Sequence, residues 1–251
     1  RQPSAPKDGT KVPFVYEKSA YIHKGFNGQP LAVIEDIGVM RHMRLAQLVI
    51  SPVTYNAMEN KINVYSNIDF EVVMTGSDMT RTKFRHDQYA TNAFGFMDSM
   101  VLRPSALKFG KKRAKESFVI VSDPMFKKAL APFEEWKKSQ GFIVKTIYTD
   151  KYGVGAAITE PLKRDLHELY NNPTPAMPAP SYVLFVGDHE QIPAFRGRTG
   201  THITELYYVA VTPGDFLPDM LTGRFSAQNV EQLLPQIEKT ISYGQREFAD
   251  S

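Results

Sequence analysis

The stretch SYVLFVGDHEQIPAF, residues 181–195, decides the fold. Its apolar side chains run without a break from Tyr182 to Val186 and then stop at the Gly-Asp-His step of residues 187–189. A strand without polar alternation is typical of a parallel sheet that helices cover on both faces. The stretch is therefore predicted to be a central parallel strand that ends in an acid.

The sequence before this strand alternates between strand and helix patterns. Residues 117–123, SFVIVSD, and residues 142–149, FIVKTIYT, are short apolar runs. Each is followed by a segment whose apolar residues recur at helical spacing, 124–141 and 158–172. Strands joined by helical crossovers pair in parallel with right-handed connections. The pattern predicts a β-α-β-α-β unit that ends in the strand of residues 182–186.

The α/β domain is predicted to cover residues 111–251. Beyond the central strand, residues 205–211, ELYYVAV, and 221–226, LTGRFS, read as further strands. Residues 227–243 read as a closing helix with a stripe of Val, Leu and Ile side chains. The expected architecture is a three-layer α/β domain with a mostly parallel sheet.

The first half of the chain has a different texture. In residues 44–76, Ile62, Val64, Ile68 and Phe70 fall at even spacing, and a polar break at NAMENK separates two extended segments. No window in this half keeps an apolar period of 3.6 residues. We predict an α+β chain of two modules, whose first, over residues 1–110, is an antiparallel β-sandwich-like module.

Composition limits the possible partners. The chain has 251 residues, a formal charge of +3 and 42% hydrophobic residues, so a folded core is expected and no nucleic-acid partner is required. The sequence predicts no membrane span, and the first ten residues carry no apolar signal core, so we expect any export signal to have been removed before Arg1. The chain contains no cysteine, which excludes disulfides, thiolate metal sites and a thiol nucleophile within it.

Carboxylates mark two candidate sites. Asp188 follows a parallel strand at its carboxyl end, where sites of such sheets gather. In AVTPGDFLPDML, Asp215 and Asp219 flank Leu217 at two-residue steps, which lets two carboxylates and one carbonyl approach a single Ca²⁺ ion. The residues leave a second interpretation open for each: Asp188 as a turn residue, and the loop as a solvated acidic turn.

Other familiar sites are not indicated. No glycine-rich fingerprint follows the strand of residues 117–123, so a nucleotide or phosphate site is not favoured, and no G-x-S-x-G elbow occurs. The six histidines show no metal-ligand spacing, and His167 is expected to be a solvated residue on a polar helix face.

Several segments carry a family resemblance. YVLFVGDHEQIPA, ELYYVAV with GDFLPDM, GRFSAQNVEQLLPQIEKTISY and FEEWKKSQGFIVKTIYTD resemble the first subdomain of the gingipain family of secreted bacterial cysteine endopeptidases. Upstream, KVPFVYEKSAYIHKG and QLVISPVTYNAMENKINVYSNIDFEVV resemble the later part of the β-rich propeptide of those enzymes. The likeness runs from about Lys11 to Tyr243.

The resemblance implies a fragment of a gingipain-like endopeptidase precursor from a Bacteroidetes-like bacterium. The family's catalytic cysteine and histidine lie in a second subdomain downstream, so this chain is expected to be inactive alone, with no catalytic residue of its own. Its implied partners are that catalytic subdomain and, through it, protein or peptide substrates, and its implied location is secreted or at the cell surface. The alternative is a catalytically inactive family member that acts as a binding or adhesion module, and the sequence downstream of Ser251 would separate the two.

The resemblance also implies a structural calcium ion. Carried over position by position, its ligands are the side chains of Asp188, Asp215 and Asp219 and the backbone carbonyls of Leu217 and Thr212. The ion would pin a loop that has little apolar anchorage, and it would offset the repulsion among three carboxylates.

A basic segment separates the two predicted modules. RPSALKFGKKRAKES, residues 103–117, includes Arg103, Lys111, Lys112 and Arg113 and has no apolar period. Charge runs of this kind are usually solvated linkers. By the family resemblance, the same segment is where proteolysis separates propeptide from enzyme, and we expect the cut between Arg103 and Lys115 with the two parts still associated.

Overall fold

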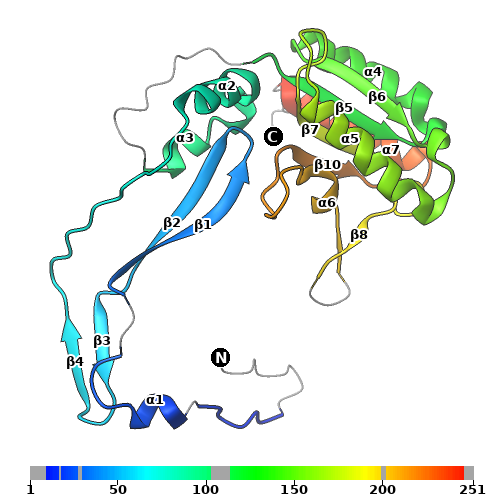
Figure 1. Ribbon diagram of the computed structural model, residues 1–251. Helices are drawn as coiled ribbons and strands as arrows, with labels where there is room; N and C mark the ends of the chain where they lie inside the picture. The colour runs from blue at the N-terminus through cyan, green and yellow to red at the C-terminus, as the bar shows by residue number, and fades with distance from the viewer. Residues whose placement is uncertain (1–9, 17, 28–29, 103–113, 199–201, 246–251) are drawn as a thin grey trace, which may run out of the picture. The chain divides into compact units, whose positions relative to one another are not determined.

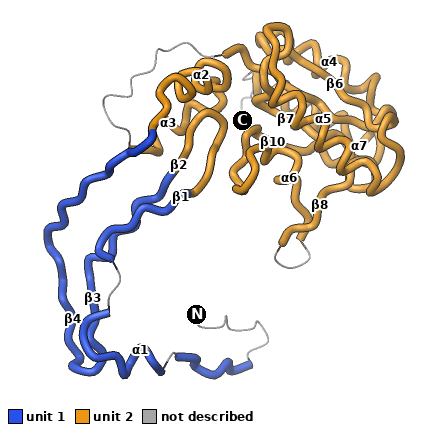
Figure 2. The backbone as a smooth tube through the Cα atoms, viewed as in Figure 1, with its two compact units in different colours: residues 1–36, 46–76 blue, residues 37–45, 77–251 orange. Residues whose placement is uncertain are grey.

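The computed structural model describes residues 10–16, 18–27, 30–102, 114–198 and 202–245. Contacts divide the chain into two compact units, shown in Figure 2: Arg1–Asp36 with Ala46–Gly76, and Ile37–Leu45 with Ser77–Ser251. The second unit therefore contains more than the predicted α/β domain. It also includes the tip of a hairpin from the first half and the segment that follows residue 76.

The centre of the second unit is a four-stranded parallel sheet, as the sequence predicts. Its strands are β5 (Ser117–Ser122), β6 (Ile143–Tyr148), β7 (Pro180–Val186) and β10 (Leu221–Phe225), in the order β10-β7-β5-β6. β5 is buried along its whole length and β7 nearly so, because they occupy the two inner positions. This burial explains their unbroken apolar runs.

Helices cover both faces of this sheet, which confirms the three-layer architecture (Figure 1). On one face, Phe118 and Ile120 of β5 share a core with α4 (Lys127–Ser139) and α7 (Val230–Gln245). On the other face, Val119 and Val121 share a core with α5 (Thr159–Asn171) and α6 (Leu206–Val209). The alternation follows from the two-residue side-chain period of a strand.

Short elements connect these layers. They are η2 (Pro124–Phe126), η3 (Thr149–Tyr152), η4 (Gly155–Ile158) and the antiparallel pair β8 (Phe195–Arg196) and β9 (Ile203–Thr204). At η2, the Asp123 side chain accepts a hydrogen bond from the Met125 amide, so this acid caps a turn directly after β5.

The prediction of a strand over residues 205–211 is wrong, because the middle of this segment forms the one-turn helix α6. Tyr208 and Val209 are fully buried in the core that α5 shares with the sheet. The Tyr208 ring lies 5.0 Å from that of Phe185 and 4.8 Å from that of Phe195, and its hydroxyl donates to the Pro193 carbonyl. Tertiary packing of the aromatic residues outweighs their β-propensity here.

Residues 77–102 contain three helical segments, whereas no helix is predicted in the first half. They form α2 (Met79–Tyr89), η1 (Asn92–Phe94) and α3 (Met97–Met100). Asp78 caps α2 by accepting the Arg81 amide at 2.9 Å. α2 buries only its last turn, at His86 and Tyr89, so the sequence carries no apolar stripe along it.

The hairpin strands of the first half are β1 (Ala32–Met40) with β2 (Met43–Ile50), and β3 (Val53–Asn56) with β4 (Lys61–Val64). A short helix, α1 (Lys18–Ile22), precedes them. Antiparallel pairing is as predicted, but among the described residues these are two separate two-stranded sheets. The β-sandwich stays a prediction, and the extended segment predicted around Ile68 and Phe70 has no strand partner in the described part of the chain.

Among the described residues, no helix has the length and apolar character that crossing a membrane requires.

Candidate functional site

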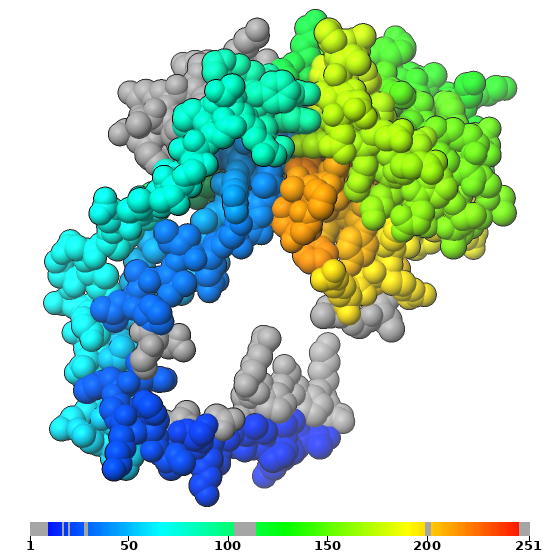
Figure 3. All heavy atoms as spheres, in the orientation of Figure 1, coloured from blue at the N-terminus to red at the C-terminus, as the bar shows by residue number. Residues whose placement is uncertain are grey.

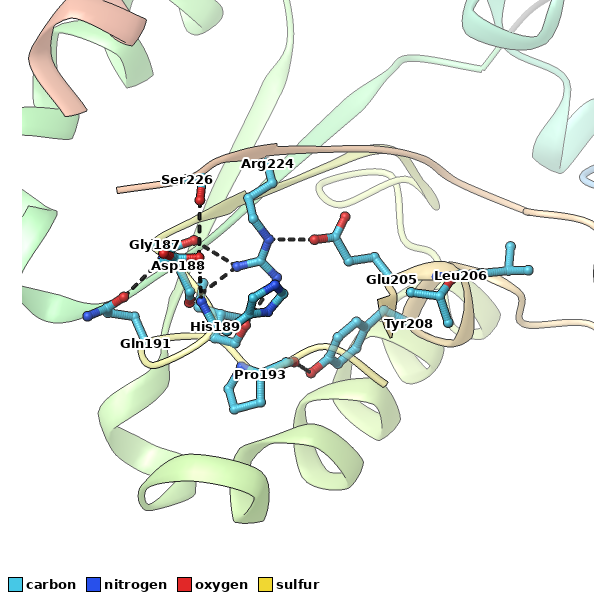
Figure 4. Close-up of polar contacts among 12 residues, drawn as sticks. Gly187, Asp188, His189, Gln191, Pro193, Glu205, Leu206, Tyr208, Arg224 and Ser226 are labelled. Carbon is cyan, nitrogen blue, oxygen red and sulfur yellow. Dashed lines mark hydrogen bonds and ion pairs between the residues drawn. The ribbon is translucent and has the colours of Figure 1, made fainter. Parts of the chain in front are cut away.

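Asp188 lies at the carboxyl edge of the sheet, where it organises the turn after β7. Its Oδ1 accepts the His189 amide at 2.9 Å and the Ser226 hydroxyl at 3.1 Å (Figure 4). Its Oδ2 accepts the Gln228 side-chain amide at 3.2 Å. The His189 amide is the main cause that lowers the pKa of Asp188, and the bonds from Gln228 and Ser226 add to it. The carboxylate ties the end of β7 to the segment after β10.

Arg224 of β10 holds the same turn from the other side. Its side chain is largely buried and pairs with Glu205, and it donates to the backbone carbonyls of Gly187 at 2.7 Å and Ile192 at 3.1 Å (Figure 4). Gly187 itself has a φ of 135°, and a Cβ there would lie 2.7 Å from that of Gln191. The turn therefore requires glycine and is held by hydrogen bonds from within the protein. This geometry supports the interpretation of Asp188 as a turn residue.

The second group of acids lies in the loop of residues 212–219, called the acid loop below. Asp219 is fully buried. Its Oδ2 accepts the amides of Val211 at 2.9 Å and Thr212 at 2.8 Å, and its Oδ1 accepts the Arg41 amide at 2.9 Å and the Tyr170 hydroxyl at 3.3 Å. Both oxygens of this carboxylate are engaged by protein donors.

Asp215 is held in a similar way by the hairpin tip between β1 and β2. Its Oδ2 accepts the Val39 amide at 2.8 Å, and its Oδ1 accepts the Leu217 amide at 2.9 Å. Gly38 has a φ of 135°, and a Cβ there would lie 2.5 Å from that of Asp215, so only glycine permits this approach. Figure 3 shows the orange atoms of this part of the chain beside the blue atoms of the hairpin tip.

The structure does not bring the five predicted calcium ligands together. In the parallel pair of β7 and β10, Leu221 lies opposite Tyr182 and Phe225 opposite Val186. Asp219 therefore precedes the amino end of this pair, whereas Asp188 follows its carboxyl end. The two acids lie at opposite edges of the sheet, because the strands run in the same direction.

The hydrogen bonds of the acid loop also differ from the arrangement of oxygen ligands around a calcium ion. Thr212 contributes its amide and hydroxyl to Asp219, and the Asp219 oxygens already accept hydrogen bonds. Among the described residues, no group of three or more acidic or histidine side chains is placed to hold a metal. Calcium binding stays a prediction, and the carboxylate oxygens of Asp215 and Asp219 accept amide and hydroxyl donors here.

The predicted processing residues Arg103, Lys111, Lys112 and Arg113 lie outside the described residues. Just beyond them, the Ala114 amide donates to the Ala90 carbonyl at 2.9 Å.

His167 is half-buried on α5, not fully solvated as expected, and this burial lowers its pKa.

Sequence reasoning missed Arg41, the residue at the tip of the β1–β2 hairpin. It is fully buried, adopts a left-handed backbone conformation with a φ of 58°, and contacts both the acid loop and the amino end of β7. The available signal was the polar Arg-His pair between two apolar strands, which indicates a turn but not its burial.

Two family models match the chain in succession: Propeptide_C25 over residues 4–95, and Peptidase family C25 over residues 111–251. The chain belongs to peptidase family C25. Lys-gingipain of Porphyromonas gingivalis is 36% identical to this C25 chain over 253 residues, which cover 99% of the chain and 15% of that protein. Gingipain R1 of the same species is 24% identical over 245 residues, covering 94% of the chain and 23% of that protein.

The crystal structure of the Arg-specific cysteine proteinase gingipain R is 22% identical to this C25 chain, with a TM-score of 0.46 over 53% of this chain and 29% of that one. The C25 chain spans less than a quarter of the length of both curated relatives. The family match confirms the gingipain resemblance found in the sequence, including the order of propeptide and peptidase segments.

Proposed function

We propose that this chain is the later propeptide and the first, noncatalytic subdomain of a cysteine endopeptidase precursor. The observation that carries the proposal is the succession of a C25 propeptide match and a C25 peptidase match along one chain. A cysteine peptidase needs a thiolate and a base that activates it. Because the chain has no cysteine, the thiolate must come from outside it. We place both the thiolate and its base in a downstream subdomain that binds and cleaves proteins or peptides.

The chain's own part is a scaffold with the propeptide attached. Propeptide residues 37–45 and 77–102 belong to the same compact unit as the peptidase subdomain, and Tyr89 is part of the core on the α5 face of the sheet. The sheet keeps its shape through this core and through the Arg224 network at its carboxyl edge. We place the mature protein outside the cell or at its surface, and calcium as a structural cofactor of the peptidase subdomain when the hairpin tip does not occupy Asp215 and Asp219.

The test is an activity measurement on the whole precursor after maturation. It should hydrolyse peptide substrates, and a thiol-alkylating reagent should abolish the hydrolysis, whereas the 251-residue chain should show none with or without the reagent. Absence of hydrolysis by the matured precursor over a broad peptide library would favour the inactive binding or adhesion module. Hydrolysis that survives alkylation would contradict a cysteine mechanism.

A further inference from the structure

Arg41 offers an unusual set of contacts for a residue at a hairpin tip. Its side chain is fully buried, and its left-handed backbone is a conformation that bulky residues adopt only when the surroundings hold them there. The Arg41 carbonyl is fixed by the Arg85 guanidinium at 2.8 Å, and the Arg41 amide by Asp219. The backbone of the tip is therefore held on both sides.

Each nitrogen of the Arg41 guanidinium finds acceptors. Nε donates to the Tyr89 carbonyl at 2.8 Å, and the two terminal nitrogens donate to main-chain carbonyls and to one hydroxyl. These acceptors are the carbonyls of Pro180, of Asp219 at 3.1 Å and of Ala179 at 2.9 Å, and the Ser181 hydroxyl at 3.4 Å. Five contacts match the five N–H donors of the group. We call the site formed by these acceptors the Arg41 slot.

Aromatic rings and a carboxylate complete the slot. The Arg41 Cζ lies 5.3 Å from the ring centre of Phe94 and 5.2 Å from that of Tyr170, within the range of cation–π attraction. The Tyr170 hydroxyl donates to Asp219, whose carboxylate supplies the negative charge. Burial lowers the pKa of Arg41, and Tyr170 and Asp219 oppose that shift. The slot is built for one planar, fully hydrogen-bonded cation.

Most of the groups that accept hydrogen bonds from Arg41 follow the predicted cleavage segment in the sequence. Arg41, Tyr89 and Phe94 precede it, whereas Tyr170, Ala179, Pro180, Ser181 and Asp219 belong to the peptidase subdomain. Cutting between Arg103 and Lys115 therefore breaks none of these contacts. Other polar contacts cross the same boundary, among them those from the Ala93 amide to Glu116, from the Ser181 hydroxyl to that of Thr91 and from the Val39 amide to Asp215.

We propose that Arg41 is the anchor by which the cut propeptide stays bound to the peptidase subdomain. The inference rests on the proposed function, because it assumes that a precursor is cut in this segment. Buried, fully paired arginines are typical of the few residues that dominate an interface.

The test uses the whole chain with a site-specific protease sequence in place of residues 104–110. After cutting, the two parts of the wild-type chain should elute together, and dilution followed by size-exclusion chromatography gives their Kd. Arg41→Met keeps the length of the side chain and removes its donors, and it should weaken the Kd at least about 30-fold. Arg81→Met, at an exposed position of α2 on the propeptide side of the cut, should change it less than about threefold.

Arg41→Lys is the second variant, in case Arg41→Met does not fold before cutting, which circular dichroism of the uncut chain would show. Lysine keeps the charge but has three donors for five acceptors, so we expect a Kd at least about tenfold weaker than wild type. Wild-type parts that separate, or Arg41 variants that bind like Arg81→Met, would overturn the proposal. The assay needs no hydrolysis, so an inactive precursor would refute the proposed function and leave this result intact.

Discussion

At the scale of single residues, Asp219 decides how the acid loop is held. It is buried with donors on both carboxylate oxygens, and the charged Arg41 side chain lies against its carbonyl. Asp219→Asn removes the charge and turns one acceptor into a donor facing other donors. We expect the free energy of unfolding to fall by about 3 kcal/mol or more, the usual effect of breaking a buried charged network.

Urea denaturation of the intact chain measures this loss. Asp188→Asn is the matched control, since the same substitution at the partly exposed acid should cost about 1 kcal/mol or less. Equal losses for the two variants would mean that Asp219 has no special role in the fold.

The lowered pKa of Asp188 predicts how the stability of the fold depends on pH. The His189 amide lowers the pKa of this acid below its usual value of 3.8. A pKa that is lower in the folded than in the unfolded chain stabilises the fold above the unfolded value, and this stability is lost as pH falls through the folded pKa. The stability difference between wild type and Asp188→Asn should therefore shrink between about pH 6 and pH 3. Urea midpoints that differ equally at both pH values would contradict this role.

At the scale of elements, the β1–β2 hairpin reaches the acid loop only because Gly38 allows it. A Cβ at Gly38 would lie 2.5 Å from the Asp215 Cβ, and the φ of 135° is unfavourable for any other residue. Gly38→Ala should lower the free energy of unfolding by about 2 kcal/mol. Gly223→Ala, in β10, has open space around its Cβ and an ordinary φ, and it should cost about 1 kcal/mol at most. Thermal unfolding of both variants tests the difference.

Elements with a simple burial pattern could be predicted from the sequence. β5 and β7 are inner strands, so their apolar runs reveal them, and α5 shows its buried stripe in Leu162, Leu166 and Tyr170. α2 could not be predicted in this way, because it is mostly exposed. α6 could not either, because its aromatic residues favour a strand until the sheet and α5 enclose them.

The candidate site was predictable in part. The position of Asp188 at the carboxyl end of a strand follows from the β-α-β pattern, and so does the presence of an acid loop before the next strand. Asp188 and the acid loop lie at opposite ends of the strands because of the register of β7 with β10. This register cannot be read from a local sequence pattern. The partner of Asp219 is Arg41, 178 residues away in the sequence, and only the fold brings them together.

At the scale of the whole molecule, the hairpin tip occupies carboxylate oxygens that the predicted calcium ion would need. The amides of Val39 and Arg41 occupy Asp215 and Asp219 in this chain. For the uncut chain we therefore expect equal melting temperatures in excess calcium and in chelator. A calcium-bound fold at about 100 times its Kd would instead gain roughly 2.7 kcal/mol, which a melting scan resolves easily. Such a rise in the metal-stripped sample would show that the predicted calcium site forms despite these hydrogen bonds.

The most direct test of a precursor whose propeptide is cut but retained is native mass spectrometry of the matured protein purified from its host. We predict one complex that contains two pieces of this chain, with the break between Arg103 and Lys115. Denaturing the same sample should release the propeptide as a separate mass. A peptide that spans residues 103–115 intact in the active enzyme, or an active enzyme without the propeptide piece, would contradict the account.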